Sequence, residues 1–235
     1  MRPVKLRTVV RGYNPTKTDF LFERRLNDHI YGVLNDFSSG KSSLVFCSSR
    51  KGTSETAVHV AKEAGKQAAP GRPSALVRDA AQQARLAAAA AQLRNTQLRE
   101  CLLAGVGFHH AGMEAEERAV VEALFTSQAL LVLCTTSTLA MGVNLPARLV
   151  VIKGTRRYIG SKATDASGYQ EYERSACLQM VGRAGRPQFD TEGVAVIMTQ
   201  RQHTQRYQAL AAGAEVGGQQ GGQQRCLTPC PGGWS

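Results

Sequence analysis

The chain has 235 residues, 43% of them hydrophobic, and its formal net charge of +11 gives a pI near 9.7. A chain of this length can bury a sizeable core in one or two domains, and no apolar run approaches the length of a membrane-spanning helix. The positive charge favours an anionic partner, nucleic acid before a membrane surface; a basic surface kept for solubility is the alternative.

Cysteine usage indicates reduced thiols. The six cysteines are scattered, and charged residues follow Met1 directly, so neither a disulfide framework nor a secretory leader is expected. Cys226 and Cys230 are separated by three residues, with no second pair or suitably spaced histidine. We therefore predict no metal site.

Residues 1–19 are basic and contain Gly12 and Pro15, so we expect a linker or an edge segment that enters a domain spanning 20–215. The apolar spacing in 20–37 predicts a helix. Short apolar runs then alternate with helical patterns, which predicts an α/β fold, a parallel sheet flanked by crossover helices. The expected strands are 44–47, 106–108, 130–134, 149–152 and 194–198, and the expected helices are 53–66, 114–125 and 175–181.

The segment NDFSSGKSS at 35–43 ends in the tripeptide of a phosphate-binding loop. Such a loop needs a glycine five residues before Gly40, where this chain has Asn35. It also needs a strand before it and a helix after it, whereas a predicted helix precedes this segment and a predicted strand follows. We therefore interpret it as a solvated turn from helix to strand.

An alanine-rich stretch predicts a long helix over 75–91, because alanine is the strongest helix former. The break before it is AAPGRPS at 68–74. Its apolar face is narrow, so we expect the helix to pack loosely or to project, within an insert over 68–100 to which we assign no chemistry. Residues 216–235 are rich in glycine and glutamine without periodicity and are predicted to be disordered.

Polar side chains follow several predicted strands at their carboxyl ends. Ser48 and Arg50 follow one strand, His109 and His110 end another, and Thr136 ends a third. In open α/β sheets this edge is where ligands bind. We expect at least one of the two histidines to be an ordinary imidazole that packs the strand end.

The strongest motif is QMVGRAGRP at 179–187. Its two arginines, Arg183 and Arg186, are three apart and are expected on one side of a helical turn, and the glycines let backbone and guanidinium groups approach a phosphate. Arginine's planar fork suits phosphate oxygens and stays charged at any working pH. Taken alone, the motif is equally compatible with arginines paired to acidic residues or with a flexible basic loop.

Four stretches in this order resemble the second half of superfamily-two helicases, in the branch of the Ski-type RNA helicases, the splicing helicases and their DNA-acting relatives: LVFCSSRKG, FHHAGM, TTSTLAMGVNLPA and QMVGRAGRPQFD. The third stretch and RPQFDTEGVAVIMT most resemble the eukaryotic meiotic crossover helicases. The resemblance covers residues 1–66 and 100–215, leaving out the alanine-rich stretch and the tail. It implies a second RecA-like domain, part of a nuclear, ATP-dependent 3′–5′ DNA helicase of meiotic recombination. The P-loop and DExH box belong to the first RecA-like domain and are absent from this sequence, so we expect no ATP hydrolysis by the chain alone.

The resemblance also implies roles at the nucleotide, ATP with Mg²⁺ held mainly by the first RecA-like domain. Arg186 corresponds to the arginine finger, Arg183 to a contact with phosphate or with the first domain, and Gln179 to a coupling between water and nucleotide state. Gly142 and Asn144 correspond to the segment near the ribose and magnesium. We expect Arg186 to be exposed, at the ligand edge of the sheet, and its loss to cost less than roughly 1 kcal/mol of folding free energy.

The implied nucleic-acid contacts go to the backbone of single-stranded or branched DNA. Thr136 is the first candidate, followed by Ser48, Arg50 and His110. Backbone contacts distinguish DNA from RNA poorly. Two alternatives therefore stay open: part of an RNA helicase of the same branch, and a nucleic-acid-binding fragment without enzymatic activity.

Overall fold

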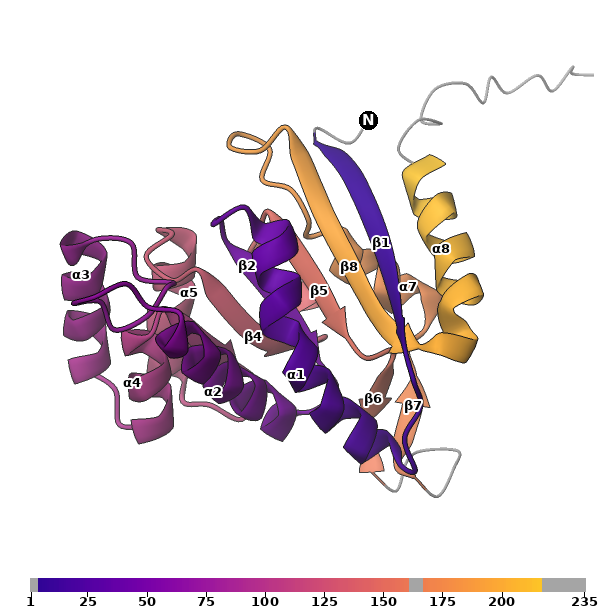
Figure 1. Cartoon of the computed structure of the whole chain (residues 1–235), viewed down its shortest axis with the longest axis horizontal. Coiled ribbons are helices and arrows are strands. Elements are labelled where there is room, and N and C mark those ends of the chain that lie inside the picture. The colour runs from indigo at the N-terminus through magenta and orange to yellow at the C-terminus, as the bar shows by residue number, and fades with distance from the viewer. Residues whose placement is uncertain (1–3, 161–166, 217–235) are drawn as a thin grey trace, which may run out of the picture.

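The computed structural model describes residues 4–160 and 167–216 as alternating strands and helices (Figure 1). The strands are β1 Lys5–Tyr13, β2 Ser43–Cys47, β3 Val106–His109, β4 Val132–Thr136, β5 Leu149–Lys153, β6 Arg156–Tyr158, β7 Tyr169–Glu171 and β8 Glu192–Gln200. The helices are α1 Asp19–Ser38, α2 Arg50–Lys66, α3 Ala80–Ala91, α4 Thr96–Leu103, α5 Ala115–Thr126, α6 Leu139–Gly142, α7 Arg174–Val181 and α8 Thr204–Val216, with a 3₁₀ turn at Arg201–His203.

Six strands form one parallel sheet in the order β1-β8-β5-β2-β4-β3. Strands β2 and β5 at its centre are buried along their whole length, which explains why both are continuous apolar runs. Strands β6 and β7 form a separate antiparallel pair. All six strands of the main sheet end at the same edge, which Figure 1 shows at the bottom, beside β6 and β7.

Helices cover both faces of the sheet. α1 contacts β5, and α2 contacts β2, β3 and β4, so these two helices cover one face. α5 contacts β3 and α7 contacts β5 from the other side, and in Figure 1 α1 lies in front of the sheet and α7 behind it. α8 packs against the outer strand β1. The core between these layers is one continuous cluster of buried apolar side chains.

The predicted α/β fold is confirmed. The five expected strands and the helices predicted over 20–37, 53–66, 114–125 and 175–181 are present with small shifts at their ends. β1 was not predicted as a strand: residues 5–13 pair along their whole length with β8 at the margin of the sheet, where they are an integral part of it. β6 and β7, three residues each, are too short to show a period in the sequence.

The alanine-rich helix is shorter and better packed than expected. Asp79 caps it, accepting a hydrogen bond from the backbone N–H of Gln82 at 2.7 Å, so α3 begins at Ala80. Its side chains Gln82, Leu86 and Ala90 are buried, and Gln82 donates to the carbonyls of Leu76 and Ala129. The expectation of loose packing or projection was therefore wrong, because a polar side chain, Gln82, supplements the narrow apolar face.

The GKS segment is a turn from helix to strand, as predicted. Helix α1 ends at Ser38, Ser39 and Gly40 both have positive φ (53° and 68°), and β2 begins at Ser43. The left-handed pair ends the helix and reverses the chain.

Three further predictions concern the tail of the chain, membrane-spanning helices and metal sites. The tail at 216–235 and the cysteines Cys226 and Cys230 lie outside the described residues, except Val216, which ends α8. None of the helices in the described ranges has the length and apolar character needed to cross a bilayer. Within 4–160 and 167–216, no three histidine, cysteine, aspartate or glutamate side chains lie together in a group that could hold a metal ion.

Candidate functional site

The predicted nucleic-acid candidates come together at the carboxyl edge of the sheet. β2, β4 and β3 are neighbours, with Cys47 opposite Thr136 and His109 opposite Thr135, so the residues after these strands lie in one row. Arg50 is exposed, and both its guanidinium and the ring of His110 lie within 3.3 Å of the position that a Cβ on Gly112 would occupy.

One of the nucleic-acid candidates in this row, Ser48, is not accessible for contact with nucleic acid, contrary to the expectation. Ser48 is buried, its carbonyl accepts a hydrogen bond from the N–H of Tyr158, and its hydroxyl lowers the pKa of Glu23 by hydrogen bonding. Its side chain is therefore used inside the protein. Thr136 is half-buried, and its hydroxyl bonds that of Thr138 at 2.9 Å.

The two histidines differ, as expected. His109 is buried and its Nε2 lies 2.7 Å from Glu122, so it is the ordinary packed imidazole. Burial lowers the pKa of His110, and the charges of Arg50 and His109 lower it further. His110 therefore stays neutral at physiological pH, and its Nδ1 accepts a hydrogen bond from the N–H of Gly112.

The two arginines of the GRAGR motif lie at the opposite, amino edge of the sheet. α7 ends at Val181, so Arg183 and Arg186 follow the helix and occupy the loop that leads into β8 (at the top of Figure 1). Two expectations were wrong: that the pair lies on a helical turn, and that Arg186 lies at the carboxyl edge. The chain must return from the carboxyl edge along α7 before β8 begins, and this return places the motif at the far end.

Arg183 joins two of the predicted motifs. Its Nη1 donates to Asn144 Oδ1 at 2.8 Å, and its Nε and Nη2 both donate to the carbonyl of Ala140. The backbone repeats the link, because Ala147 N–H donates to Arg183 O at 3.0 Å. Five residues were predicted to lie near the nucleotide. Four of them therefore form this junction or lie within a few residues of it in the sequence: Gly142, Asn144, Arg183 and Arg186.

The fifth, Gln179, is exposed on α7 one turn before the motif. Gly142 and Asn144 are exposed as well. These three residues are open to solvent, whereas Arg186 is largely covered by the protein.

Arg186 is buried and paired, contrary to the expectation of an exposed side chain. Only 6% of its surface is exposed, and its Nε and Nη2 donate to the two oxygens of Asp190 at 2.8 and 3.0 Å. Lys41 Nζ donates to the same carboxylate at 3.0 Å. Burial alone would raise the pKa of Asp190, but the hydrogen bonds from Arg186 and Lys41 outweigh it and hold this pKa at about 2. Neither the pairing of Arg186 with Asp190 nor the contact of Lys41 with Asp190 was predicted from the sequence, although Asp190 stands four residues after Arg186 in the same motif.

Glycines of the motif serve packing. Gly185 has φ of +90°, and a Cβ there would meet the side chain of Val4 at 2.7 Å. A Cβ on Gly193, at the start of β8, would meet the backbone N of Gly185 at 2.5 Å. The motif loop therefore lies directly on the backbone of β8, and the predicted reason for these glycines, close approach to phosphate, gains no support at Gly185.

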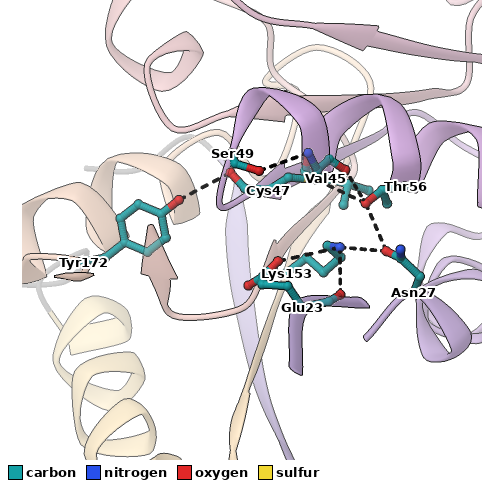
Figure 2. A network of polar contacts seen from close by, with 9 residues as sticks. Glu23, Asn27, Val45, Cys47, Ser49, Thr56, Lys153 and Tyr172 are labelled. Atoms are coloured by element: carbon teal, nitrogen blue, oxygen red, sulfur yellow. Dashed lines mark hydrogen bonds and ion pairs between the residues drawn. The ribbon is translucent and has the colours of Figure 1, made fainter. Parts of the chain in front are cut away.

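A buried polar network underlies the carboxyl edge (Figure 2). Lys153, at the end of β5, donates to Asn27 Oδ1 at 2.6 Å and to the carbonyl of Glu23, and its Nζ lies 3.7 Å from the Glu23 carboxylate. Asn27 in turn accepts from Thr56 on α2. The network ties α1 and α2 to the end of β5, at the same edge of the sheet as the nucleic-acid candidates. Burial raises the pKa of Glu23 to about 7, with Lys153 opposing the shift.

The raised pKa predicts a pH-dependent stability. Folded Glu23 keeps its proton to about pH 7, whereas in the unfolded chain it loses the proton near the ordinary value of 4.5. Between these values the folded state binds more protons, so the free energy of unfolding should fall as pH rises from 5 to 8, by at most about 3 kcal/mol. Glu23→Gln should flatten this dependence. Urea unfolding at several pH values measures it, with the exposed Glu100→Gln as control; equal slopes in Glu23→Gln and wild type would contradict the assignment.

Comparison with known proteins identifies the class. Residues 80–188 match the family described as the helicase conserved C-terminal domain. The chain therefore carries a helicase C-terminal domain, and the resemblance seen in the four motifs is confirmed. The matched range also includes residues 80–99, which contain α3 and the first half of α4 and which the resemblance did not cover.

Three curated relatives are similar in sequence to this chain over most of its length. The chain is 45% identical over 216 residues to the ATP-dependent DNA helicase homolog MER3 of Arabidopsis thaliana, covering 92% of this chain and 18% of that protein. It is 45% identical over 213 residues to the probable ATP-dependent DNA helicase HFM1 of Mus musculus, covering 90% of this chain and 14% of the relative. The U5 small nuclear ribonucleoprotein 200 kDa helicase of Drosophila melanogaster is 38% identical over 209 residues, 89% of this chain and 9% of the relative. The chain thus spans less than a fifth of the length of these relatives.

Proposed function

We propose that the chain is the second motor domain of an ATP-dependent 3′–5′ DNA helicase that acts in meiotic recombination in the nucleus. The observation that carries the proposal is the separation of two groups of residues on one rigid sheet. Arg50, His110 and Thr136 lie at its carboxyl edge, and Arg183 and Arg186 lie at its amino edge. A domain of this kind can hold nucleic acid at one end while it contacts a nucleotide-bearing partner domain at the other.

At the amino edge, Arg186 and Arg183 serve the γ-phosphate of ATP, whose Mg²⁺ complex the first RecA-like domain holds. The residues fit this task, because Arg186 Nη1 is buried and has no hydrogen-bond partner in the described part of the chain. A guanidinium placed there stabilises negative charge that develops during phosphoryl transfer. Gln179, Gly142 and Asn144 contribute further contacts around the nucleotide, and the chain alone lacks the means to hydrolyse it.

At the carboxyl edge, Arg50 and Thr136 contact the backbone of single-stranded or branched DNA, with neutral His110 as a hydrogen-bonding partner. Buried Ser48 supports this edge from within. The relatives named for MER3 and HFM1 are DNA helicases, which supports DNA as the substrate over RNA.

Binding of single-stranded DNA by the purified chain should be weak and should fall steeply with salt, because each neutralised phosphate releases counterions. Arg50→Ala should lower the slope of log affinity against log salt by roughly 0.7, the value for one phosphate contact on a single strand. Fluorescence anisotropy between low and physiological salt measures both, and Arg85→Ala, exposed on α3, is the matched control. If salt left the affinity unchanged, or if Arg85→Ala lowered the slope as much as Arg50→Ala, the phosphate contact of Arg50 would be refuted. A parallel series with single-stranded RNA tests whether DNA is the preferred substrate.

A further inference from the structure

Two charged side chains of the motif loop, Arg186 and Asp190, meet Lys41 from a distant part of the chain. Asp190 is buried, with none of its side chain exposed, and accepts hydrogen bonds from Arg186 and from Lys41. Its second oxygen also accepts from the backbone N–H of Arg186 at 3.1 Å. Lys41 is the lysine of the GKS turn between α1 and β2, which the proposed function leaves without a role.

The pairing holds the guanidinium of Arg186 in one orientation. Asp190 binds it side-on, through Nε and Nη2, at 2.8 and 3.0 Å. The centroid of the Phe189 ring lies 5.4 Å from the guanidinium carbon, within the range of a cation–π contact. A planar group bound on one edge by two hydrogen bonds cannot rotate freely, so its remaining edge, which carries Nη1, points in a fixed direction.

Arg186 is one of the residues that line a cavity of about 280 Å³. Its lining includes Arg186, Ser42 and Asn144 together with apolar side chains, among them Leu145 and Phe189. Arg186 Nη1 and Ser42 Oγ are both buried and without a hydrogen-bond partner within the described ranges. Both atoms can donate, so each can bind an acceptor oxygen that reaches it.

The charges of the cluster favour an anionic acceptor. Lys41 and Arg186 supply two positive charges and Asp190 one negative charge, which leaves one positive charge uncompensated within the cluster. Because two cations stabilise the carboxylate, Asp190 stays ionised throughout the physiological pH range. Asparagine at 190 would remove that charge and one of the two acceptor oxygens.

We propose that Asp190, tethered by Lys41, is a positioning residue that fixes Arg186 and leaves its Nη1 unpaired, to donate to a phosphate oxygen of the nucleotide on the first RecA-like domain. This inference rests on the proposed function and adds to it the residues that position Arg186. Lys41, the lysine of the GKS turn, thereby influences phosphoryl transfer indirectly, because it holds the carboxylate that orients Arg186. The opposite reading, in which Asp190 withholds Arg186 from the nucleotide, predicts higher turnover when the carboxylate is removed.

The test uses the complete motor, with Asp190→Asn and Lys41→Met as the two variants. Asp190→Asn should lower kcat for ATP about 10- to 100-fold while the nucleotide dissociation constant changes less than about 3-fold, since misplacement of a catalytic group by an ångström is enough for such a loss. Lys41→Met, whose side chain is partly exposed, should lower kcat less, with an unchanged melting temperature. Lys66→Met, which removes a surface lysine paired with Glu63, is the matched control and should leave kcat unchanged.

A double-mutant cycle separates positioning from a structural role. In an Arg186→Ala background, Asp190→Asn should lower kcat no further, because there is no guanidinium left to position. An equal further loss in that background, a rise in kcat on Asp190→Asn, or normal kcat in both single variants would each overturn the inference. If Arg186→Ala itself turns over ATP normally, the proposed function fails instead.

Discussion

Arg186→Ala should lower ATP turnover by the complete motor by roughly 10³-fold or more, while nucleotide affinity changes little. The guanidinium contributes most when charge develops on the transferred phosphoryl group, so its loss raises the barrier much more than it weakens ground-state binding. Arg186→Lys should not restore turnover, because an ammonium group cannot bind Asp190 side-on and present a free edge to the nucleotide at the same time.

The same substitution should also destabilise the domain, contrary to what the sequence alone suggested. Removal of the guanidinium leaves the buried carboxylate of Asp190 with Lys41 as its remaining charged partner. Breaking a buried pair in this way costs about 2 kcal/mol or more. Turnover and nucleotide dissociation constant must therefore be measured on the same sample, at a temperature where a melting curve shows the variant folded. Near-normal turnover in the folded variant would rule out the finger assignment.

The sheet could be predicted from the sequence because its central strands are buried on both faces. Short runs such as 149–152 are continuously apolar and rich in β-branched residues, which is typical of a buried strand. β1 escaped prediction because it lies at the margin of the sheet and mixes charged with apolar residues, and a marginal strand needs no continuous apolar run. The packing of α3 depends on hydrogen bonds of Gln82 to distant carbonyls, which no periodicity reveals.

The candidate site was predictable in its residues and not in its arrangement. The motifs identified Arg183 and Arg186, but their place at the amino edge follows from the path of α7. Asp190 could have been found from its spacing of four residues from Arg186. Lys41 could not, because 149 positions separate it from Asp190 and only the tertiary fold brings the two together.

In the proposed function, this domain completes an ATP-binding site whose other residues belong to the first RecA-like domain. The most direct test is steady-state phosphate release, with single-stranded DNA present, from three samples: this chain alone, the first RecA-like domain alone, and the two joined in one motor. We expect turnover only in the joined motor, because the positive charge at Arg183 and Arg186 stabilises the transition state only against a nucleotide that the first domain holds. Phosphate release by this chain alone above that of its Arg183→Ala, Arg186→Ala double variant would show that the chain hydrolyses ATP without a partner domain and would contradict this expectation.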